Sequence, residues 1–270
     1  MAIFIQKPWY RKGGSGGVWV PQEWNVSIDA GDRTWTDGED IYYSWLGTSY
    51  KLNKSTKNWD TITWSDSGYT SIKGTEIFIY DNTHVIYLDD RLRYEFSKPD
   101  NAWYLIKWRG GTPDRAWGSR TWTDGENLYL SSNSDQYRMG GIYTSNTYIW
   151  ETKTWNGLSS FVGQSVWTDG NNIYYSSQST QKILDVSTST WSDKIWNGLS
   201  SFDGIDVWTD GTDIYYSATY PSNQQYILDK STSTWSVKNW GNISDIRGRY
   251  VWTDGTDIYY SYSTSQYKLA

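Results

Sequence analysis

One spacing of tryptophan residues recurs along the whole chain and restricts what it can fold into. The pattern Trp-x4-Trp occurs at Trp19/Trp24, Trp59/Trp64, Trp103/Trp108, Trp150/Trp155, Trp191/Trp196 and Trp235/Trp240. A repeat of about 40–50 residues is typical of β-propeller blades. An aromatic residue that returns in every repeat is expected to pack neighbouring repeats together rather than to bind a ligand, because each buried ring removes a large apolar area from water.

A second motif predicts a hairpin in each repeat. Trp-Thr-Asp-Gly, followed by Ile-Tyr-Tyr-Ser or a close variant, begins at Trp35, Trp122, Trp167, Trp208 and Trp252. We interpret residues 74–78 (Gly-Thr-Glu-Ile-Phe) as a sixth, degenerate copy that keeps the glycine and the β-rich run. Asp-Gly provides the positive φ that tight hairpin turns need, so the motif predicts two paired strands joined at the glycine.

The fifth repeat shows the expected strands most clearly. They cover residues 205–209, 213–217, 225–229 and 234–238. The composition agrees, because 20 Trp and 24 Tyr stand against 5 Phe, and aromatic residues favour strands. No segment keeps the 3.6-residue apolar period of a helix. We therefore predict an all-β fold of four-stranded antiparallel blades.

The two ends of the chain predict closure. After Gly255 only two strands are expected, at 257–261 and 266–269, so the sixth repeat lacks its last strand. The missing Trp-x4-Trp element lies at the N-terminus, at Trp19/Trp24. An N-terminal strand that completes the last blade would remove exposed sheet edges. We predict a six-bladed β-propeller over residues 18–270.

Residues 1–17 lie outside the repeat and form a predicted tail. Trp9 and Tyr10 stand in a short basic and aromatic stretch, and residues 13–17 are a Gly/Ser tether. Two interpretations stay open, a disordered leader and a docking segment. We favour docking because the tail carries apolar and aromatic residues.

Charge and composition argue against several classes of partner. The net charge is −6 with no basic stripe, whereas nucleic-acid binding needs a surface of Lys and Arg. No apolar run is long enough for a signal peptide or a membrane span. We expect synthesis in the host cytoplasm, no membrane insertion and no nucleic-acid partner.

Few residues offer catalytic chemistry. The only histidine, His84, is expected in an irregular surface stretch, and cysteine is absent, which argues against zinc sites and nucleophilic triads. Residues 65–70 only approximate the box of sialidase propellers. The Asp-Gly-x-Asp/Asn turns are expected to be structural, with a weak cation site as the alternative. We expect no catalytic residue, cofactor or metal, although a glycosidase using two carboxylates stays open.

Binding is expected where the blades differ. The connections at 44–49, 81–93, 109–119, 131–141 and 218–224 vary in length and composition, and variable loops on a rigid frame commonly carry binding. Exposed Trp, Tyr and Arg are frequent interface anchors. The candidate partner-binding residues are Trp45, Arg109, Arg115, Trp117 and Tyr220, together with Trp9 and Tyr10 of the tail.

The repeat resembles the kelch repeat in its run Ile-Tyr-Tyr-Ser … Tyr-x-Leu-Asp-x-Ser-Thr-x-Thr-Trp, over residues 18–270. A closer likeness is to Trp/Tyr-rich repeats of bacteriophage virion proteins, especially tail components, through Val-Trp-Thr-Asp-Gly and Trp-Asn-Gly-Leu-x-Ser-Phe (155–161 and 196–202). The resemblance implies a non-catalytic virion structural protein, tail- or fibre-associated, that docks to other virion proteins. A lectin-like propeller that binds a host receptor or glycan is the first alternative, and a glycan-cleaving enzyme is the second.

Overall fold

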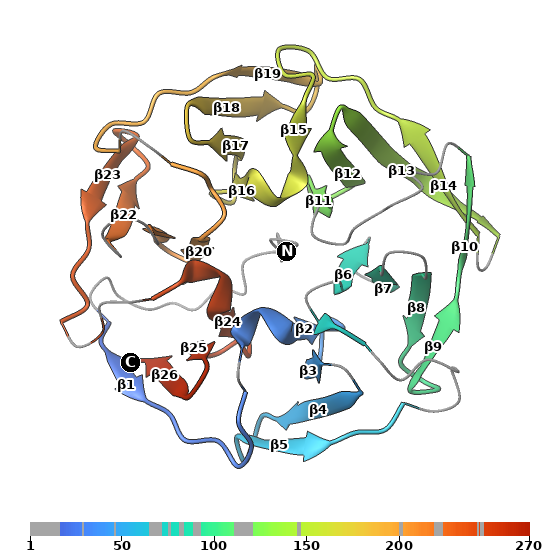
Figure 1. Ribbon diagram of the computed structural model, residues 1–270, viewed down its shortest axis with the longest axis vertical. Helices are drawn as coiled ribbons and strands as arrows, with labels where there is room; N and C mark the ends of the chain where they lie inside the picture. The colour runs from blue at the N-terminus through green and yellow to red at the C-terminus, as the bar shows by residue number, and fades with distance from the viewer. Residues whose placement is uncertain are drawn as a thin grey trace. The chain divides into compact units, whose positions relative to one another are not determined.

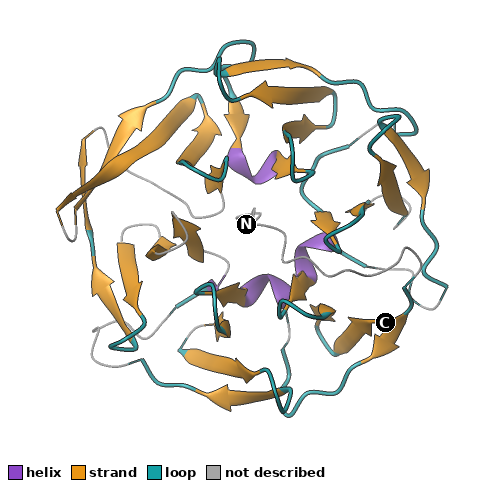
Figure 2. Cartoon of the chain, turned by 180° about the vertical axis from the view of Figure 1, so that it is seen from behind, coloured by secondary structure: helices purple, strands orange, loops and turns teal. Residues whose placement is uncertain are grey.

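A computed structural model describes most of the repeat region. The described residues are 17–28, 30–45, 47–64, 72–74, 77–80, 84–88, 93–110, 121–144, 147–199, 202–218, 224–241, 243 and 246–270. Strands dominate, and the helical elements are short 3₁₀ turns, among them η1 (Gly31–Arg33), η4 (Gly163–Ser165) and η5 (Gly248–Tyr250). Figure 2 shows these three turns directly before the first strands of their sheets.

The strands form six sheets that follow one another along the chain (Figure 1). We call them blades 1 to 6. Blade 1 contains β2 (Thr34–Thr36), β3 (Ile41–Trp45), β4 (Thr48–Asn53) and β5 (Asn58–Thr61), and blade 2 contains β6 (Ile77–Tyr80), β7 (His84–Leu88), β8 (Arg93–Ser97) and β9 (Ala102–Leu105). Blade 3 contains β11 (Thr121–Thr123), β12 (Leu128–Asn133), β13 (Asp135–Thr144) and β14 (Thr147–Thr152), with β10 (Lys107–Gly110) and β15 (Phe161–Val162) added to it.

The remaining three blades have four strands each. Blade 4 contains β16 (Val166–Thr168), β17 (Ile173–Ser177), β18 (Thr180–Asp185) and β19 (Thr190–Asp193). Blade 5 contains β20 (Val207–Thr209), β21 (Ile214–Ser217), β22 (Gln225–Asp229) and β23 (Thr234–Val237). Blade 6 contains β24 (Val251–Thr253), β25 (Ile258–Tyr262), β26 (Ser265–Leu269) and β1 (Trp19–Pro21).

Blade 6 joins the two ends of the chain. β1 pairs with β26 in antiparallel register, with Trp19 opposite Leu269 and Pro21 opposite Tyr267. The N-terminal strand therefore completes the last blade, as predicted. Six consecutive four-stranded antiparallel blades with this closing strand make the fold a six-bladed β-propeller, which confirms the predicted fold class. The chain divides into two compact units, of which one holds blades 1 to 3 and the other holds blades 4 to 6.

Each Trp-Thr-Asp-Gly hairpin is a small polar and aromatic module. In blade 1, the ring of Trp35 stacks on that of Tyr42 with centroids 4.3 Å apart, and its indole nitrogen donates to the Oγ of Ser44 at 3.0 Å. The stack and the buried hydrogen bond together explain why Trp, Tyr and Ser return at fixed spacing. The same stack and hydrogen bond recur in four other groups of three residues, which are Trp122/Tyr129/Ser131, Trp167/Tyr174/Ser176, Trp208/Tyr215/Ser217 and Trp252/Tyr259/Ser261.

In blades 2, 5 and 6, the first tryptophan of the Trp-x4-Trp pair packs on the hairpin module of the preceding blade. Trp103 of blade 2 contacts Trp35 of blade 1 with ring centroids 5.5 Å apart, and Trp235 of blade 5 contacts Trp167 of blade 4 at 6.0 Å. Trp19 of blade 6 contacts Trp208 of blade 5 in the same way, at 5.9 Å. All six of these first tryptophans are almost fully buried, namely Trp19, Trp59, Trp103, Trp150, Trp191 and Trp235.

The second tryptophan of a pair packs on the hairpin of its own blade. The ring of Trp64 lies 5.8 Å from that of Tyr42, and its indole nitrogen donates to the Oγ of Ser49 at 2.9 Å. Trp64 also contacts Trp103 of blade 2 with ring centroids 6.0 Å apart, so packing between blades is only part of its role. The equivalent contacts inside one blade are Trp24/Trp252, Trp155/Trp122, Trp196/Trp167 and Trp240/Trp208.

Trp108 departs from the other second tryptophans. Those five lie in irregular segments that follow an outer strand. Trp108 instead lies in β10 and pairs with Tyr148 of β14 in a parallel register. The assumption that all six pairs are equivalent is therefore wrong at this position, because only Ile106 separates β9 from β10 and the chain continues directly into a strand along blade 3. The predicted packing of the Trp108 side chain lies outside the described residues.

The interpretation of residues 74–78 as a degenerate hairpin turn is wrong. β6 pairs Ile77 with Tyr87, as β2 pairs Thr34 with Tyr43. Gly74 therefore lies three residues before the first strand of blade 2, and the pairing of β6 with β7 continues to Tyr80 and His84. A Cβ atom on Gly74 would lie 1.9 Å from the carbonyl oxygen of Arg33, so glycine is required by this close approach.

Glycine holds the same position before the first strand of other blades. The first strand begins three residues after Gly31, Gly163, Gly204 and Gly248 as well. At Gly248 a Cβ atom would lie 2.1 Å from the carbonyl oxygen of Asp206 in the preceding blade. The repeat therefore has a second glycine that allows successive blades to approach, and Gly74 belongs to that series.

Candidate functional site

The Asp-Gly turns use their carboxylates to hold the hairpins. Oδ1 of Asp37 accepts the backbone N–H groups of Glu39 and Asp40 at 3.0 and 2.7 Å. Oδ2 of Asp37 accepts the hydroxyl of Tyr42 at 3.1 Å. The recurring aspartates are thus occupied in structural bonds, and no group of three or more His, Cys, Asp or Glu able to hold a metal occurs in the described part of the chain. The equivalent aspartates, Asp124, Asp169, Asp210 and Asp254, make the same three bonds.

The repeated tryptophans offer little surface to a ligand. Trp64, Trp155 and Trp196 are all buried, at no more than 9% exposed. The lysine two residues earlier also places its Nζ 4.6 Å from the ring centre in Lys153/Trp155 and Lys194/Trp196. A sugar needs an open ring face on which to stack, so the binding surface is better sought at residues that depart from the repeat.

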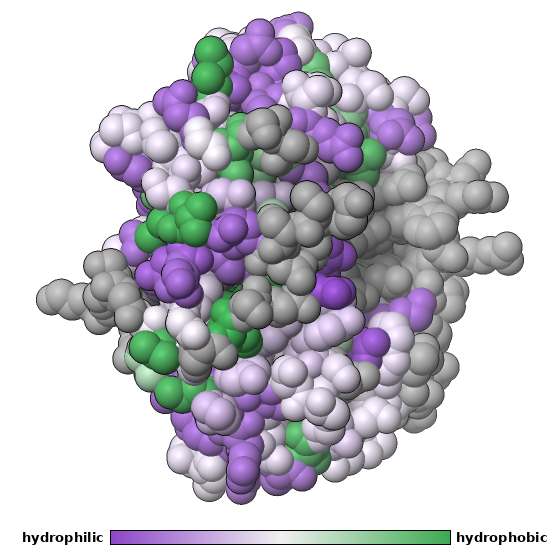
Figure 3. Space-filling model, turned by 60° about the vertical axis from the view of Figure 1, so that its left-hand side comes forward, coloured by the Kyte–Doolittle hydropathy of each residue, from purple (hydrophilic) through white to green (hydrophobic). Residues whose placement is uncertain are grey.

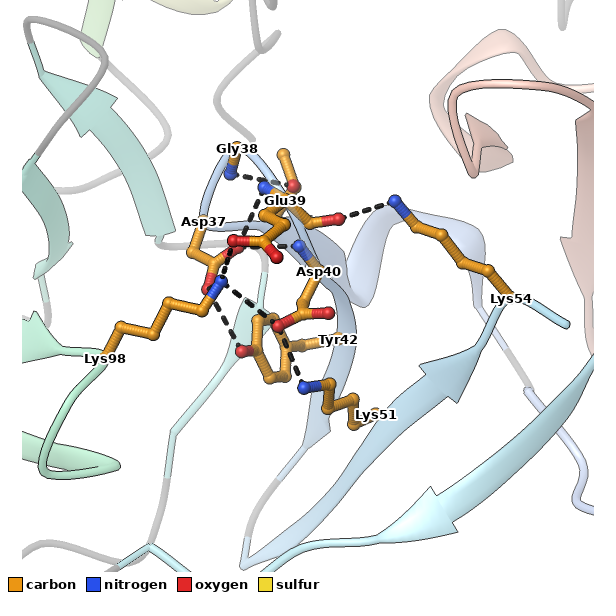
Figure 4. Close-up of polar contacts among 9 residues, drawn as sticks. Asp37, Gly38, Glu39, Asp40, Tyr42, Lys51, Lys54 and Lys98 are labelled. Carbon is orange, nitrogen blue, oxygen red and sulfur yellow. Dashed lines mark hydrogen bonds and ion pairs between the residues drawn. The ribbon is translucent and has the colours of Figure 1, made fainter.

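One of the Asp-Gly turns also carries a cluster of opposite charges, drawn in Figure 4. Lys98, from the turn between β8 and β9, places its Nζ 2.6 Å from Glu39 Oε2, 3.2 Å from Asp40 Oδ2 and 3.3 Å from Asp37 Oδ2. Lys51 approaches Asp40 Oδ2 at 2.8 Å. Partial burial acts to raise the pKa of Asp40, but the two ammonium groups outweigh it and hold that pKa below its usual value. The cluster ties blade 2 to blade 1.

We expect replacement of Lys98 by Met to lower the free energy of unfolding by about 1 kcal/mol or less, because the ion pairs of Lys98 are partly exposed and are screened by solvent. Asp40 has a lowered pKa in the folded protein, so its contribution is present above the unfolded pKa of about 3.9 and is lost as pH falls through the folded pKa. The difference between the variant and the unmodified protein should therefore vanish in acid. Urea titrations at several pH values measure it.

Lys230→Met is the matched control. Lys230 stands at the same position of blade 5, five residues before the buried tryptophan, and its Nζ contacts the backbone oxygen of Asp169 at 3.4 Å. A backbone carbonyl does not titrate, so the effect of this change should not depend on pH across the acid range, to within about 0.5 kcal/mol. An equal acid dependence in both variants would contradict the assigned role of Lys98.

The opposite end of blade 1 carries a different kind of cluster. Trp45 is the last residue of β3 and is half-buried. The guanidinium carbon of Arg33 lies 3.6 Å from the centre of the Trp45 ring, and Nη1 of Arg33 donates to the hydroxyl of Tyr43 at 3.4 Å. A cation over an indole ring is a favourable contact. Arg33 and Trp45 therefore form an ordered pair at the end of blade 1 where β3 is followed by β4.

Blade 6 has a corresponding cluster in its own unit. Tyr262 ends β25 as Trp45 ends β3. The rings of Tyr262 and Tyr250 stack with centroids 4.6 Å apart, and the guanidinium carbon of Arg247 lies 4.8 Å from the Tyr262 ring. Blades 3, 4 and 5 instead have small residues at this position, which are Ser132, Ser177 and Ala218.

Among the residues predicted to bind a partner, Trp45 is the one whose side chain the structure places. Arg109 lies in β10, opposite Ile149 of β14, so it belongs to a strand and not to a connecting loop. Arg115, Trp117, Tyr220, Trp9 and Tyr10 lie outside the described residues.

Three further sequence-based expectations are wrong. Residues 131–141 are not a variable loop, because β12 and β13 pair through Ser132 and Asp135. His84 is not in an irregular stretch, since it pairs with Tyr80 at the start of β7. The predicted connection 81–93 therefore contains a complete strand. The last two errors follow from the placement of the blade 2 turn at Gly74.

Sequence reasoning missed Arg33, Arg247, Tyr250 and Tyr262. A usable signal was present, because the position three residues after the stacking tyrosine is aromatic in blades 1 and 6 and small in blades 3 to 5. The arginine partners have no comparable signal. Arg33 lies twelve residues before Trp45, and only the fold brings the two side chains together.

Comparison with known proteins supports the fold. No family model and no curated protein matches the chain. Among solved structures, the extracellular domain of a one-component system from B. thetaiotaomicron matches with a TM-score of 0.51 and 10% identity over 96% of this chain and 41% of that one. The extracellular domain of a hybrid two-component system from the same organism gives 0.52 and 10% over 94% and 42%.

A chain from the structure of the mitotic checkpoint complex matches with a TM-score of 0.54 and 13% identity, over 96% of this chain and 93% of that one. This chain spans less than half the length of the two B. thetaiotaomicron chains that it matches. At such identities the likeness shows the fold alone. In the described residues no helix is long and apolar enough to cross a membrane.

Proposed function

We propose that this propeller is a non-catalytic docking module that binds another protein through the blade end that carries Trp45. The observation that supports the proposal is the contact of Arg33 with Trp45, 3.6 Å from guanidinium carbon to ring centre. Trp, Tyr and Arg are the residues that most often dominate the binding energy of protein interfaces. A side chain that is already ordered before binding also loses less conformational entropy in the complex.

Variation between blades supports the same surface. The hairpin modules repeat in composition because they build the core, whereas Trp45 and Tyr262 replace the Ser or Ala of blades 3 to 5. A large half-buried ring at this position is therefore not needed to form a blade. A role in binding explains this ring better than a role in forming the blade.

The recurring carboxylates support a non-catalytic role. Each turn aspartate accepts two backbone N–H groups and a tyrosine hydroxyl, as Asp210 does from Thr212, Asp213 and Tyr215. A carboxylate held in this way is a poor general base or nucleophile, since most of its acceptor positions are already in use. The glycan-cleaving enzyme thus remains the weakest of the three candidate functions.

The finer proposal is that the partner is another protein of a virus particle. It is supported by the resemblance of the Val-Trp-Thr-Asp-Gly repeats to those of bacteriophage tail components. In this role the chain would be a tail- or fibre-associated structural protein. Its presence at fixed stoichiometry in purified particles, and its location in electron micrographs of them, would test this role, and its absence from such particles would refute it.

A lectin-like function is the second candidate, because Trp and Tyr rings also stack on sugars. The position of Arg33 over the Trp45 ring makes that ring less accessible for stacking and favours the protein partner. A glycan array probed with the pure chain separates the two. Binding to a defined glycan that is lost in Trp45→Ala would favour the lectin.

We expect Trp45→Ala to weaken partner binding by at least about tenfold, as hot-spot truncations do. The partner is first identified by cross-linking in source particles, and its affinity is then measured by titration with the pure proteins. Ser177→Ala, at the same position of blade 4, should leave the affinity unchanged. Equal affinities for both variants, with both melting as folded proteins, would refute the assigned surface.

A further inference from the structure

The outer strand of blade 2 exposes two adjacent apolar side chains. Tyr104 is 50% exposed and Leu105 is 55% exposed, at the end of β9. β9 pairs with β8 on one side and is the terminal strand of its sheet in the described residues. An open edge strand with apolar residues invites pairing with another chain.

The same positions in neighbouring blades carry charges. Counting from the buried tryptophan of each outer strand, Tyr104 and Leu105 correspond to Asp60 and Thr61 in β5 and to Glu151 and Thr152 in β14. In β19 they correspond to Ser192 and Asp193. Acidic residues at such positions protect an edge from pairing. The fold therefore does not require apolar residues here. Blade 2 lacks the acidic protection that blades 1 and 4 have, whereas in blade 3 the strand β10 covers β14.

Two other outer strands expose valine but differ from β9. β1 ends at Pro21, and proline cannot donate to a new strand. In β23, Val237 is 63% exposed, but its neighbours are Ser236 and Lys238. Figure 3 brings the side with β22 and β23 forward, and it shows separate hydrophobic groups among hydrophilic ones. Single exposed apolar residues of this kind are ordinary on protein surfaces.

Tyr104 is also held in place before any contact forms. Its hydroxyl donates to Oδ2 of Asp100 at 3.0 Å, and the Oγ of Ser97 donates to the same oxygen at 2.7 Å. An ordered aromatic side chain loses little entropy on association, which favours a specific contact over non-specific adhesion.

We infer that the outer edge of β9 binds the same edge of a second copy of this chain, in an antiparallel pairing about a two-fold axis. A two-fold contact places each edge against itself. An edge such as β5 would bring Asp60 close to the same residue of the other copy, and like charges repel. The uncharged pair Tyr104–Leu105 is complementary to itself, so β9 is the edge on which a symmetric dimer is favoured.

Sedimentation of the full chain tests the inference. We expect a monomer–dimer equilibrium at concentrations up to about 1 mM. At that concentration, even a dimer with an association free energy of about −4 kcal/mol is detected. Leu105→Asp should shift the dissociation constant upward by more than about tenfold, because a two-fold contact counts the new charge twice. Val237→Asp, at the equivalent position of β23, should leave the equilibrium unchanged.

A thiol-specific cross-link identifies the edge directly. The chain has no cysteine, so Leu105→Cys and Val237→Cys each introduce a single reactive group. A short bis-maleimide should join Leu105→Cys into dimers and leave Val237→Cys monomeric, with thermal melts confirming that both variants fold. A monomer at all concentrations, or equal cross-linking of both variants, would overturn the inference. Neither result bears on partner binding at Trp45.

Discussion

Raising the pH above about 10 is expected to unfold this protein in a narrow range, because tyrosines of the hairpin modules cannot ionise while folded. Tyr42 is an example, since burial and the charge of Asp37 both raise its pKa well above the ordinary value. The same two causes, burial first and the turn aspartate second, raise the pKa of Tyr129, Tyr174, Tyr215 and Tyr259.

The sign follows from proton counts. Each of these tyrosines has a folded pKa above its unfolded value, so its stabilising contribution is complete below the unfolded pKa of about 10 and is lost as pH rises toward the folded pKa. In that window the unfolded chain has released a proton that the folded chain keeps. The loss is at most about 1.4 kcal/mol per pH unit for each tyrosine, or about 7 kcal/mol for five. A domain stable by about 5–15 kcal/mol would unfold within one or two pH units.

Absorbance of tyrosinate and near-ultraviolet circular dichroism measure the two events together. The ionisation of the module tyrosines should coincide with the loss of the tertiary signal. Tyr215→Phe removes one titrating group, so the slope of stability against pH should fall by one proton, while stability at neutral pH falls by about 1 kcal/mol from the lost hydrogen bond. Full ionisation of all tyrosines with an unchanged tertiary signal would contradict the prediction.

The regular part of the fold could be predicted because its physical causes are local. Trp35, Tyr42 and Ser44 lie within one hairpin, so their spacing is visible along the chain. The N-terminal strand was also predictable, since the sixth repeat lacks its own outer strand and Trp19 supplies it.

Equal spacing in the sequence did not guarantee equal structure. Trp64 and Trp108 each stand five residues after a buried tryptophan, yet Trp64 packs on the hairpin of its own blade and Trp108 lies in a strand that pairs with β14. The difference depends on where the chain goes next, which the Trp-x4-Trp pattern does not encode.

Blade 2 was predicted less well, because its deviations hide the register. Its first strand has no Trp-Thr-Asp-Gly motif. Tyr80 and His84 correspond to Asp37 and Asp40 of blade 1, but one more residue separates them along the chain. Gly74 then resembles a turn glycine in sequence, although it serves the approach of one blade to the next. Pairing partners, and not composition, decide between the two roles.

The candidate surfaces depend on long-range contacts in the same way. Trp45 could be proposed from its departure from the repeat, but its partner Arg33 could not. The apolar edge at Tyr104 and Leu105 has meaning only once their exposure is known and the residues are compared with Asp60 and Glu151 at the same strand position. Sequence reasoning therefore locates positions where blades differ, and the fold shows which of them face solvent.

Loss of the closing strand is expected to be the most damaging local change. The side chain of Trp19 is completely buried, and its ring lies 5.9 Å from those of Trp208 and Trp240 of blade 5. Trp19→Ala should lower the free energy of unfolding by about 3–5 kcal/mol, because it leaves a large cavity in an aromatic core. Val20→Ala, on the exposed face of the same strand, should cost about 0.5 kcal/mol or less.

Deletion of residues 18–24 should destabilise the protein more than Trp19→Ala does. It removes Trp24, whose ring lies 5.0 Å from that of Tyr259, and the backbone bonds that join Val18 to Ala270 and Gln22 to Gln266. It also opens the edge of β26, which carries the buried Leu269. Urea unfolding and the tendency to aggregate measure the effect. A deletion variant that unfolds at the same urea concentration as the full chain would mean that β1 does not contribute to closing the propeller, and that five blades with an open sixth sheet are stable without it.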